Sequence, residues 1–351
     1  MNSLLLITGG ILFIIALALV YRIMLLVQVA KGQAGKTNRV GNSNAINGFL
    51  FIAFFVVGFG LIFWYSGRAA ENFLPEAASA HGAITDKLFW ITTAVVFAVF
   101  FLTHVILFFA PFKYRYSEDR KAFWYPHNNK LEVIWTVIPA IVLTILIVSG
   151  WKVWSDVMTT APKDRVEVEI MGKQFNWQVR YAGKDKVIGK YDFRKIDATN
   201  SFGMDFVNDK ANMDDFTPNE IHIPKGQNVL LKIRARDVLH SVFLPHFRVK
   251  MDAVPGMPTS FWFVPTISTA EMRAKLAAEG KPNAEKFDYE LACTEICGQG
   301  HFAMRLKVIV DEPAEYEKWV ASQKSFYDLN KEYVDKVVAD AAQKEKTVAS
   351  N

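Results

Sequence analysis

Long apolar stretches without charge dominate the first 155 residues of the chain. Four of them reach about the 20 residues that a helix needs to cross a bilayer. They are Leu4–Val27, which Arg22 interrupts, Ile46–Tyr65, Leu88–Phe109 and Val133–Val153. The alternative for the first stretch is a secretory signal, but it has no basic start and no cleavage site directly after it. We therefore expect four retained transmembrane helices.

The charges between these stretches predict how the helices are oriented. The connections 29–45 and 111–131 together hold eight basic residues, Lys31, Lys36, Arg39, Lys113, Arg115, Arg120, Lys121 and Lys130. Basic loops stay on the cytoplasmic side of a membrane. Both termini, and everything after about Trp154, should therefore lie outside the cytoplasm. We expect a multi-pass protein of a bacterial inner membrane with its second half in the periplasm.

Beyond residue 155 the pattern changes to short runs rich in Val, Ile, Phe and Trp, separated by Gly, Pro, Asn or Asp. Such runs are typical of a small antiparallel β-sandwich or barrel. They are Arg165–Met171, Phe175–Tyr181, Glu220–Ile223, Asn228–Ile233, His240–Phe243, Thr259–Val264, Tyr289–Cys293 and Met304–Val310. The stretch 182–218 is polar without a clear period. Ser268–Glu279 predicts a short helix capped by Ser268 or Thr269, and apolar spacing in 312–346 predicts a helical tail.

Composition excludes several classes of protein. With 351 residues, 51% of them hydrophobic, the chain is not disordered. Residues 1–150 hold 11 of the 40 Lys and Arg and 6 of the 35 Asp and Glu, which leaves 29 of each in residues 151–351. The positive excess lies in the apolar half, so nucleic acid is not an expected partner. Two cysteines also exclude a disulfide-rich scaffold.

Soft metal ligands gather in one short string near the end of the β-rich region. Residues 293–304 read Cys-Thr-Glu-Ile-Cys-Gly-Gln-Gly-His-Phe-Ala-Met. Thiolates and thioethers favour cuprous copper and imidazole supports the cupric state, so this set suits a site that exchanges one electron. The glycines let the loop turn tightly. The spacing of Cys293 and Cys297 alone also fits a disulfide, although a structural disulfide requires neither His301 nor Met304.

These residues carry a resemblance to a known family. The string Cys293-x-Glu295-x-Cys297-Gly298-x-x-His301-x-x-Met304, preceded by Asp237-Val-Leu-His240-Ser241 and by Lys250-x-Asp252-Ala-Val-Pro255-Gly256, resembles subunit II of haem–copper cytochrome c oxidases. The resemblance covers about residues 88–320. It implies a cupredoxin-like β-barrel that holds a binuclear copper centre, CuA.

The resemblance also implies a role for each ligand position. Cys293 and Cys297 would bridge two coppers, and His240 and His301 would each bind one. Met304 and the main-chain carbonyl of Glu295 would be weak further ligands. The Glu295 side chain would help to hold Mg²⁺ at the interface with subunit I. His246 is a competing imidazole, but the Asp-Val-Leu-His-Ser match favours His240.

A second match lies in the membrane part. The segment Leu131–Ala140 resembles the opening of the family's second subunit II helix, where an acid three residues before a Trp lies at the entrance of a proton path. Glu132 is therefore our candidate for proton uptake. Its alternative is an ordinary carboxylate that the helix dipole favours in a first turn. For His104, inside the third span, we expect packing or an interhelical hydrogen bond.

Three departures from the family pattern affect the electron donor. The first two spans are additional, and they offer a membrane contact with another complex or subunit. The family's Gly-x-Gln-Trp-x-Trp patch, where electrons are taken up, has Phe175 in place of its first Trp and keeps Trp177. Met257 follows Pro-Gly where a basic residue is usual. We expect weak electrostatic steering of a donor, although Asp205, Asp209, Asp214 and Asp215 could form a local acidic patch.

The expected fold is a membrane-anchored α+β chain with four N-terminal transmembrane helices, a cupredoxin-like antiparallel β-barrel and a C-terminal helical tail. Its parts are an additional helix pair (1–66), the family's transmembrane hairpin (67–154), an extracytoplasmic CuA domain (155–311) and the tail (312–351).

The resemblance implies the electron-input subunit of a proton-pumping terminal oxidase. Cytochrome c, or a haem c domain of a quinol-oxidising complex held in a supercomplex, would reduce CuA. Electrons would then pass to haem in subunit I, which works with the other oxidase subunits. A CuA subunit of a nitric oxide reductase is one alternative, and a copper chaperone or assembly factor is another. A quinol oxidase subunit II would lack the copper ligands.

Overall fold

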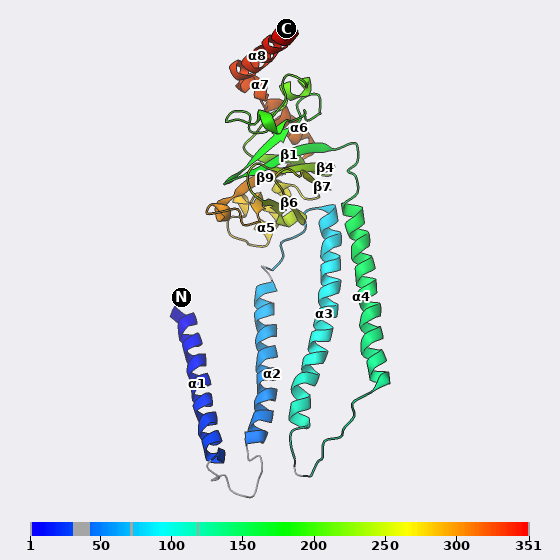
Figure 1. Ribbon diagram of the computed structural model, residues 1–351, viewed down its shortest axis with the longest axis vertical. Helices are drawn as coiled ribbons and strands as arrows, with labels where there is room; N and C mark the ends of the chain where they lie inside the picture. Colours follow the sequence, from blue (N-terminus) through cyan, green and yellow to red (C-terminus); the bar gives the residue numbers. More distant parts are fainter. Residues whose placement is uncertain (1, 31–42, 71–72, 118, 350–351) are drawn as a thin grey trace. The chain divides into compact units, whose positions relative to one another are not determined.

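The computed structural model describes residues 2–30, 43–70, 73–117 and 119–349. Four long helices come first in the chain (Figure 1). They are α1 (Asn2–Ala30), α2 (Ser43–Ala69), α3 (Ala80–Lys113) and α4 (Asn129–Val157). Each contains one of the predicted spans and is long and apolar enough to cross a membrane. The basic residues Lys31, Lys36 and Arg39 lie outside the described residues.

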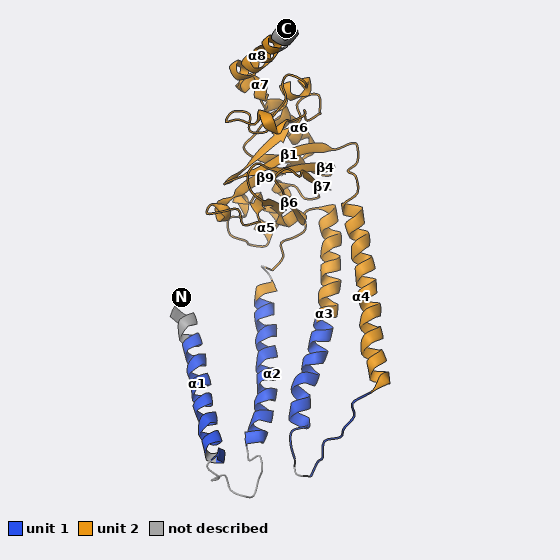
Figure 2. Ribbon diagram, in the orientation of Figure 1, with its two compact units in different colours: residues 1–68, 97–127 blue, residues 69–96, 128–351 orange. Residues whose placement is uncertain are grey.

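The chain forms two compact units, residues 1–68 with 97–127, and residues 69–96 with 128–351 (Figure 2). In the first unit, phenylalanines of α2 meet the second part of α3, where the rings of Phe59 and Phe101 lie 5.4 Å apart. His104 joins this seam, with its ring 5.9 Å from that of Phe59. Its Nδ1 lies 2.8 Å from the carbonyl oxygen of Phe100 in its own helix. His104 therefore packs as predicted, and its hydrogen bond is intrahelical.

Two β-sheets form the body of the second unit. One has the order β2-β1-β4-β7, with β1 (Val166–Lys173), β2 (Asn176–Tyr181), β4 (Val229–Ala235) and β7 (Thr259–Phe263). The other has the order β3-β9-β8-β5-β6, with β3 (Ile221–Pro224), β5 (His240–Leu244), β6 (Val249–Ala253), β8 (Tyr289–Cys293) and β9 (Arg305–Asp311). Within residues 166–311, the strand pairs β1–β4 and β3–β9 are parallel and the other pairs of named strands are antiparallel.

Alternating residues of both sheets meet in one apolar core. Ile170 and Leu231 from the first sheet and Val242 and Leu291 from the second are all fully buried. Strand β6 is not among the runs predicted above, although its burial alternates in the same way. Of its five residues only Val249 is β-branched or aromatic, whereas the predicted runs are rich in such residues, and this is why the sequence alone did not mark it as a strand.

Two features stabilise the polar connections outside the sheets. One is a helix cap, and the other is a second, small apolar cluster. Helix α5 (Thr269–Ala278) has Ser268 as its cap, in a capping box with Glu271. The stretch 182–218 holds two 3-10 helices, η2 (Phe193–Lys195) and η3 (Lys210–Met213). It shares a second apolar cluster with the tail, which consists of α6 (Pro313–Ser322), α7 (Phe326–Leu329) and α8 (Lys331–Ala349).

Candidate metal centre

Two neighbouring strands and the loop after one of them position the centre. His240 is the first residue of β5 and Cys293 is the last residue of β8. The strands pair antiparallel, with Val242 opposite Cys293. The side chains of His240 and Cys293 therefore start from adjacent points of one sheet. The following loop returns through the 3-10 helix η6 (His301–Ala303) and leads into β9.

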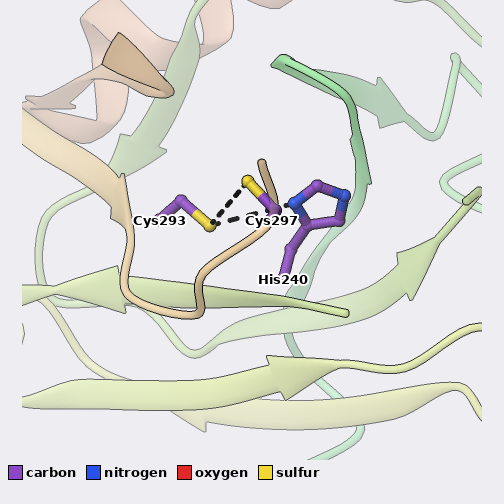
Figure 3. Close-up of side chains that lie close together, drawn as sticks. All are labelled: His240, Cys293 and Cys297. Atoms are coloured by element: carbon purple, nitrogen blue, oxygen red, sulfur yellow. Dashed lines mark hydrogen bonds between the residues drawn. The ribbon is translucent and has the colours of Figure 1, made fainter. Parts of the chain in front are cut away.

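Three of the predicted ligands form a tight, buried cluster (Figure 3). The Cys293 sulfur lies 4.0 Å from the Cys297 sulfur and 3.8 Å from Nδ1 of His240. The ligand atoms of these three residues all lie within 4.8 Å of one another. His240 is fully buried, and the two cysteines are 8% and 4% exposed.

The remaining predicted positions lie against the same two thiols. Nδ1 of His301 is 3.6 Å from the Cys297 sulfur, and the Met304 sulfur is 3.8 Å from it. The main-chain oxygen of Glu295 lies 3.3 Å from the Cys293 sulfur. The structure thus brings two thiols, two imidazole nitrogens, a thioether and a carbonyl oxygen together. This soft and borderline donor set fits copper.

Both glycines of the loop are required by its conformation and by its close neighbour. Gly298 has a φ of +129°, a backbone conformation that side chains rarely adopt. A Cβ atom at Gly298 or at Gly300 would run into the ring of Phe175. The Gln174 side-chain amide donates to the Cys297 carbonyl oxygen over 2.6 Å. The segment before β2 therefore holds the cysteine loop in place.

An aspartate orients the histidine of the cluster. Nε2 of His240 lies 2.9 Å from Oδ1 of Asp237, which leaves Nδ1 facing Cys293. Burial alone would raise the pKa of Asp237, but hydrogen bonds from the Gln174 backbone N–H and from His240 hold it below its usual value. A charged carboxylate on the far ring nitrogen fixes the tautomer and raises the basicity of a ligating imidazole.

The surroundings of Cys297 disfavour the ionisation of its thiol. Burial, and then the neighbouring Cys293, raise the pKa of Cys297 to about 11. A cation bound between the sulfurs would offset both effects, because metal ligation deprotonates a thiol.

The two aromatic residues of the expected electron-uptake region occupy different environments. Trp177 is 5% exposed, and its indole N–H donates to the Met304 carbonyl oxygen over 3.4 Å. Its ring lies 5.8 Å from that of His240. Phe175 is 42% exposed and covers the glycines of the cysteine loop. Only Phe175 of this pair therefore presents substantial surface to a partner.

Other sequence candidates lie apart from the cluster. His246 packs edge-on against the rings of Phe287 and Tyr289, and burial lowers its pKa to about 4. In the first turn of α4, Oε1 of Glu132 accepts from the backbone N–H of Asn128 over 3.4 Å. Asn128 in turn caps the helix at Leu131. Glu132 thus takes part in helix capping, and its proton-uptake role stays a prediction.

The predicted acidic patch is wrong for Asp215. This residue is fully buried and pairs with Arg180, since a buried guanidinium requires a carboxylate partner. Asp205 pairs with Lys195, and Asp209 accepts from the backbone N–H of Lys190 over 2.7 Å.

Sequence reasoning also missed the supporting roles of Asp237 and Gln174. Both stand inside the quoted motifs, and a carboxylate three residues before a ligand histidine was the available signal.

Comparison with known proteins places the chain in a family. The family model for "Cytochrome C oxidase subunit II, transmembrane domain" matches residues 67–153, and that for "Cytochrome C oxidase subunit II, periplasmic domain" matches residues 166–270. The first match includes α3 and most of α4, so α1 and nearly all of α2 precede it.

Named relatives agree with these matches. The alternative cytochrome c oxidase subunit 2 of Bradyrhizobium diazoefficiens is 36% identical over 260 residues, which cover 72% of this chain and 84% of the relative. Cytochrome c oxidase subunit 2 of Thermostichus vulcanus is 27% identical, covering 73% and 80%. Among solved structures, the periplasmic domain of subunit II of the Bradyrhizobium japonicum cytochrome oxidase matches with a TM-score of 0.31 and 22% identity, covering 46% of this chain and 96% of its own.

The helices and the matched periplasmic domain describe a membrane-anchored protein with an outward-facing, cupredoxin-like β domain. Identity over most of both chains, together with the two family matches, carries the assignment. The chain therefore belongs to the cytochrome c oxidase subunit II family of haem–copper oxidases.

Proposed function

We propose that this chain is the electron-input subunit of a proton-pumping terminal oxidase, with a binuclear CuA centre in its β domain. The observation that carries the proposal is the convergence of six donor groups, among them two thiols 4.0 Å apart. Cys293 and Cys297 would bridge the metals, and His240 and His301 would each hold one. Met304 and the Glu295 carbonyl would complete the set. When bound, the copper pair would supply one-electron exchange.

The protein would hold these ligands in fixed positions and shield them from water. His240 and Met304 are almost fully buried, Asp237 fixes the His240 ring, and Gln174 holds the Cys297 carbonyl. Ligands fixed by packing change little between two redox states. Electron transfer through such a site would then require little rearrangement. The Glu295 carboxylate is our candidate ligand for Mg²⁺ where this chain would meet subunit I.

The donor would be cytochrome c or a haem c domain that docks near Phe175, with Trp177 buried behind it. The outer half of the chain is neutral overall, and all four aspartates of the expected patch are buried or already bonded. Long-range steering should therefore be weak. We propose that a haem c domain is held in a stable assembly with a quinol-oxidising complex, where effective concentration replaces steering. The pair α1 and α2 is our candidate membrane contact.

This donor assignment is tested by comparing two rates of oxygen consumption. One is the quinol-driven rate of the intact assembly, and the other is the rate of the isolated oxidase with soluble cytochrome c at increasing ionic strength. We expect the assembly to be faster and the isolated oxidase to depend little on salt. Fast, strongly salt-dependent oxidation that matches the assembly's rate would contradict the assignment.

Proton supply to subunit I would begin at Glu132 on the cytoplasmic side, if the CuA domain lies in the periplasm of a bacterial inner membrane. Glu132→Ala should slow steady-state turnover and leave reduction of the copper centre intact. Lys130→Ala, in the same helical turn, serves as the control. Normal turnover in Glu132→Ala would leave this residue with its helix-capping role alone.

A further inference from the structure

The start of α3 is bound to the hairpin that carries the copper ligand His240. This hairpin consists of β5 and β6, joined by the 3-10 helix η4 (Pro245–Phe247) and by Arg248. Arg248 makes a two-pronged ion pair with Asp86 in the second turn of α3. Its Nε lies 2.7 Å from Oδ1, and its Nη2 lies 2.9 Å from Oδ2. All of these residues belong to one compact unit.

Arg248 is also bonded to both sides of the junction by main-chain oxygens. Its Nη1 donates to the carbonyl of Pro245 in the hairpin, and its Nη2 donates to that of Pro75 ahead of α3, each over 2.5 Å. Arg248 has a φ of +55°, in the left-handed region that residues other than glycine seldom adopt. Such a conformation persists where surrounding contacts fix it, and it is a reason to look for a function.

Backbone contacts reinforce the same junction. The Ser79 hydroxyl donates to the Phe247 carbonyl oxygen over 2.7 Å, and the Ala78 N–H donates to that of His246 over 2.7 Å. Ser79 and Ala78 are almost fully buried. The connection between helix and hairpin is therefore a packed interface and not a loose linker.

The junction lies at the opposite end of β5 from His240. Strand β5 runs from His240 to Leu244, directly before η4, so about 13 Å of paired strand separates ligand and junction. Its register with β6 is continuous from His240 opposite Ala253 to Leu244 opposite Val249. A hairpin paired along its whole length transmits a shift at one end to the other.

We propose that Asp86 and Arg248 are positioning residues, and that their ion pair clamps the outer end of α3 to the β5–β6 hairpin and so sets the place of His240 relative to the membrane helices. This proposal rests on the proposed function, because the placement matters for passing electrons to haem in subunit I. The clamp affects that transfer and leaves copper binding alone, since neither residue belongs to the ligand set.

The test uses the whole oxidase complex with single substitutions in this chain. Asp86→Asn removes the charge of the clamp. Arg248→Gly removes its guanidinium while placing at φ +55° the residue that tolerates it best. Asp86→Glu is the conservative variant. Glu76→Gln is the matched control. Glu76 lies next to Pro75 in the segment ahead of α3, and it forms an exposed ion pair with Lys275 of α5.

Two quantities are measured in each variant. The first is copper content with the near-infrared spectrum. The second is the rate at which electrons equilibrate between haem in subunit I and the copper centre of this chain, after photolysis of carbon monoxide from the partly reduced enzyme. We expect normal copper in every variant and roughly tenfold slower equilibration in Asp86→Asn and Arg248→Gly, because small displacements far from the reacting groups reduce rates steeply. Asp86→Glu should retain most of the rate, and Glu76→Gln all of it.

Unchanged equilibration in Arg248→Gly would overturn the proposal, and so would equal slowing in Glu76→Gln. If Asp86→Asn fails to assemble, Arg248→Gly decides, because glycine suits its backbone. A wild-type complex without a two-copper spectrum would contradict the proposed function, whereas a normal wild-type spectrum with unaffected variants contradicts the clamp only.

Discussion

Two buried histidines in the β domain have opposite surroundings. His222, in β3, has both ring nitrogens bonded to carboxylates, with Nδ1 2.6 Å from Asp311 and Nε2 3.0 Å from Glu220. His240, in β5, has one nitrogen bonded to Asp237, and its other nitrogen faces a thiol. The first arrangement is a complete ion pair. The second leaves one lone pair directed at soft atoms.

This difference shows which buried histidine is suited to a metal. His222 also stacks on Trp319, with the rings 4.2 Å apart, so its contacts join β3, β9 and α6. Its two carboxylates lie on opposite edges of the ring and cannot share an ion with it. The His240 carboxylate instead orients the ring for a ligand on the other side. These surroundings favour a role in the fold for His222, and they suit His240 to the proposed metal centre.

The largest expected effect follows from removing one of the two thiols of the proposed copper centre. Cys297→Ser should abolish the two-copper centre, because this sulfur contacts Cys293, His301 and Met304. Copper content and the visible spectrum of the purified complex report the loss. His222→Phe is the comparison variant and should retain its full copper. Normal copper in Cys297→Ser would contradict the assigned ligand set.

A smaller effect is expected at the carboxylate behind His240. Asp237→Asn should weaken copper binding by about 10- to 100-fold, because it removes the charge that orients the ligand. Competition with a copper chelator measures the affinity. Asp311→Asn, the equivalent change beside His222, should leave the affinity unaltered. Equal affinities in the two variants would remove the distinction between the histidines.

The substitution His222→Phe should lower the stability of the fold and leave copper binding unchanged. His222→Phe preserves a ring against Trp319 but leaves Asp311, 15% exposed at its side chain, without its partner. We expect a loss of about 1–3 kcal/mol in the free energy of unfolding. Thermal unfolding of the detergent-solubilised chain measures this loss. An unchanged midpoint would show that the ion pair contributes nothing to the fold.

The smallest expected effect is the pH dependence of that loss. Burial alone would lower the pKa of His222, but Asp311 and Glu220 raise it above its usual value of 6.5. A raised folded-state pKa gives stability that is fully present below pH 6.5 and is lost as the pH rises through the folded value. The difference between wild type and His222→Phe should therefore be larger at pH 6 than at pH 9. An equal difference at both values would contradict the charged form of His222.

The sequence predicted the spans and most of the residues that cluster around the two thiols, because both signals are local. Each span is one long apolar run, and five of the six candidate donor groups lie within residues 293–304. The family resemblance selected His240 over His246, although Asp237, three residues before His240, was also a local signal. Strand β6 was not predicted, because only Val249 of its five residues is β-branched or aromatic.

Sequence patterns did not predict the contacts between residues that are far apart in the chain. Asp86 and Arg248 are 162 positions apart, and each reads by itself as an ordinary surface charge. Asp215 resembled its half-buried neighbour Asp214, and its burial follows from Arg180, a fully buried residue of β2. Pairings of this kind depend on how the strands and the stretch 182–218 come together in space.

The most direct test of the central claim is the copper content and spin distribution of the purified, oxidised complex. Electron paramagnetic resonance with metal analysis should show two coppers at this subunit and one unpaired electron shared equally by both nuclei. Cys293→Ser should abolish that signal. A single copper with a localised spin, or a signal that survives Cys293→Ser, would contradict the account.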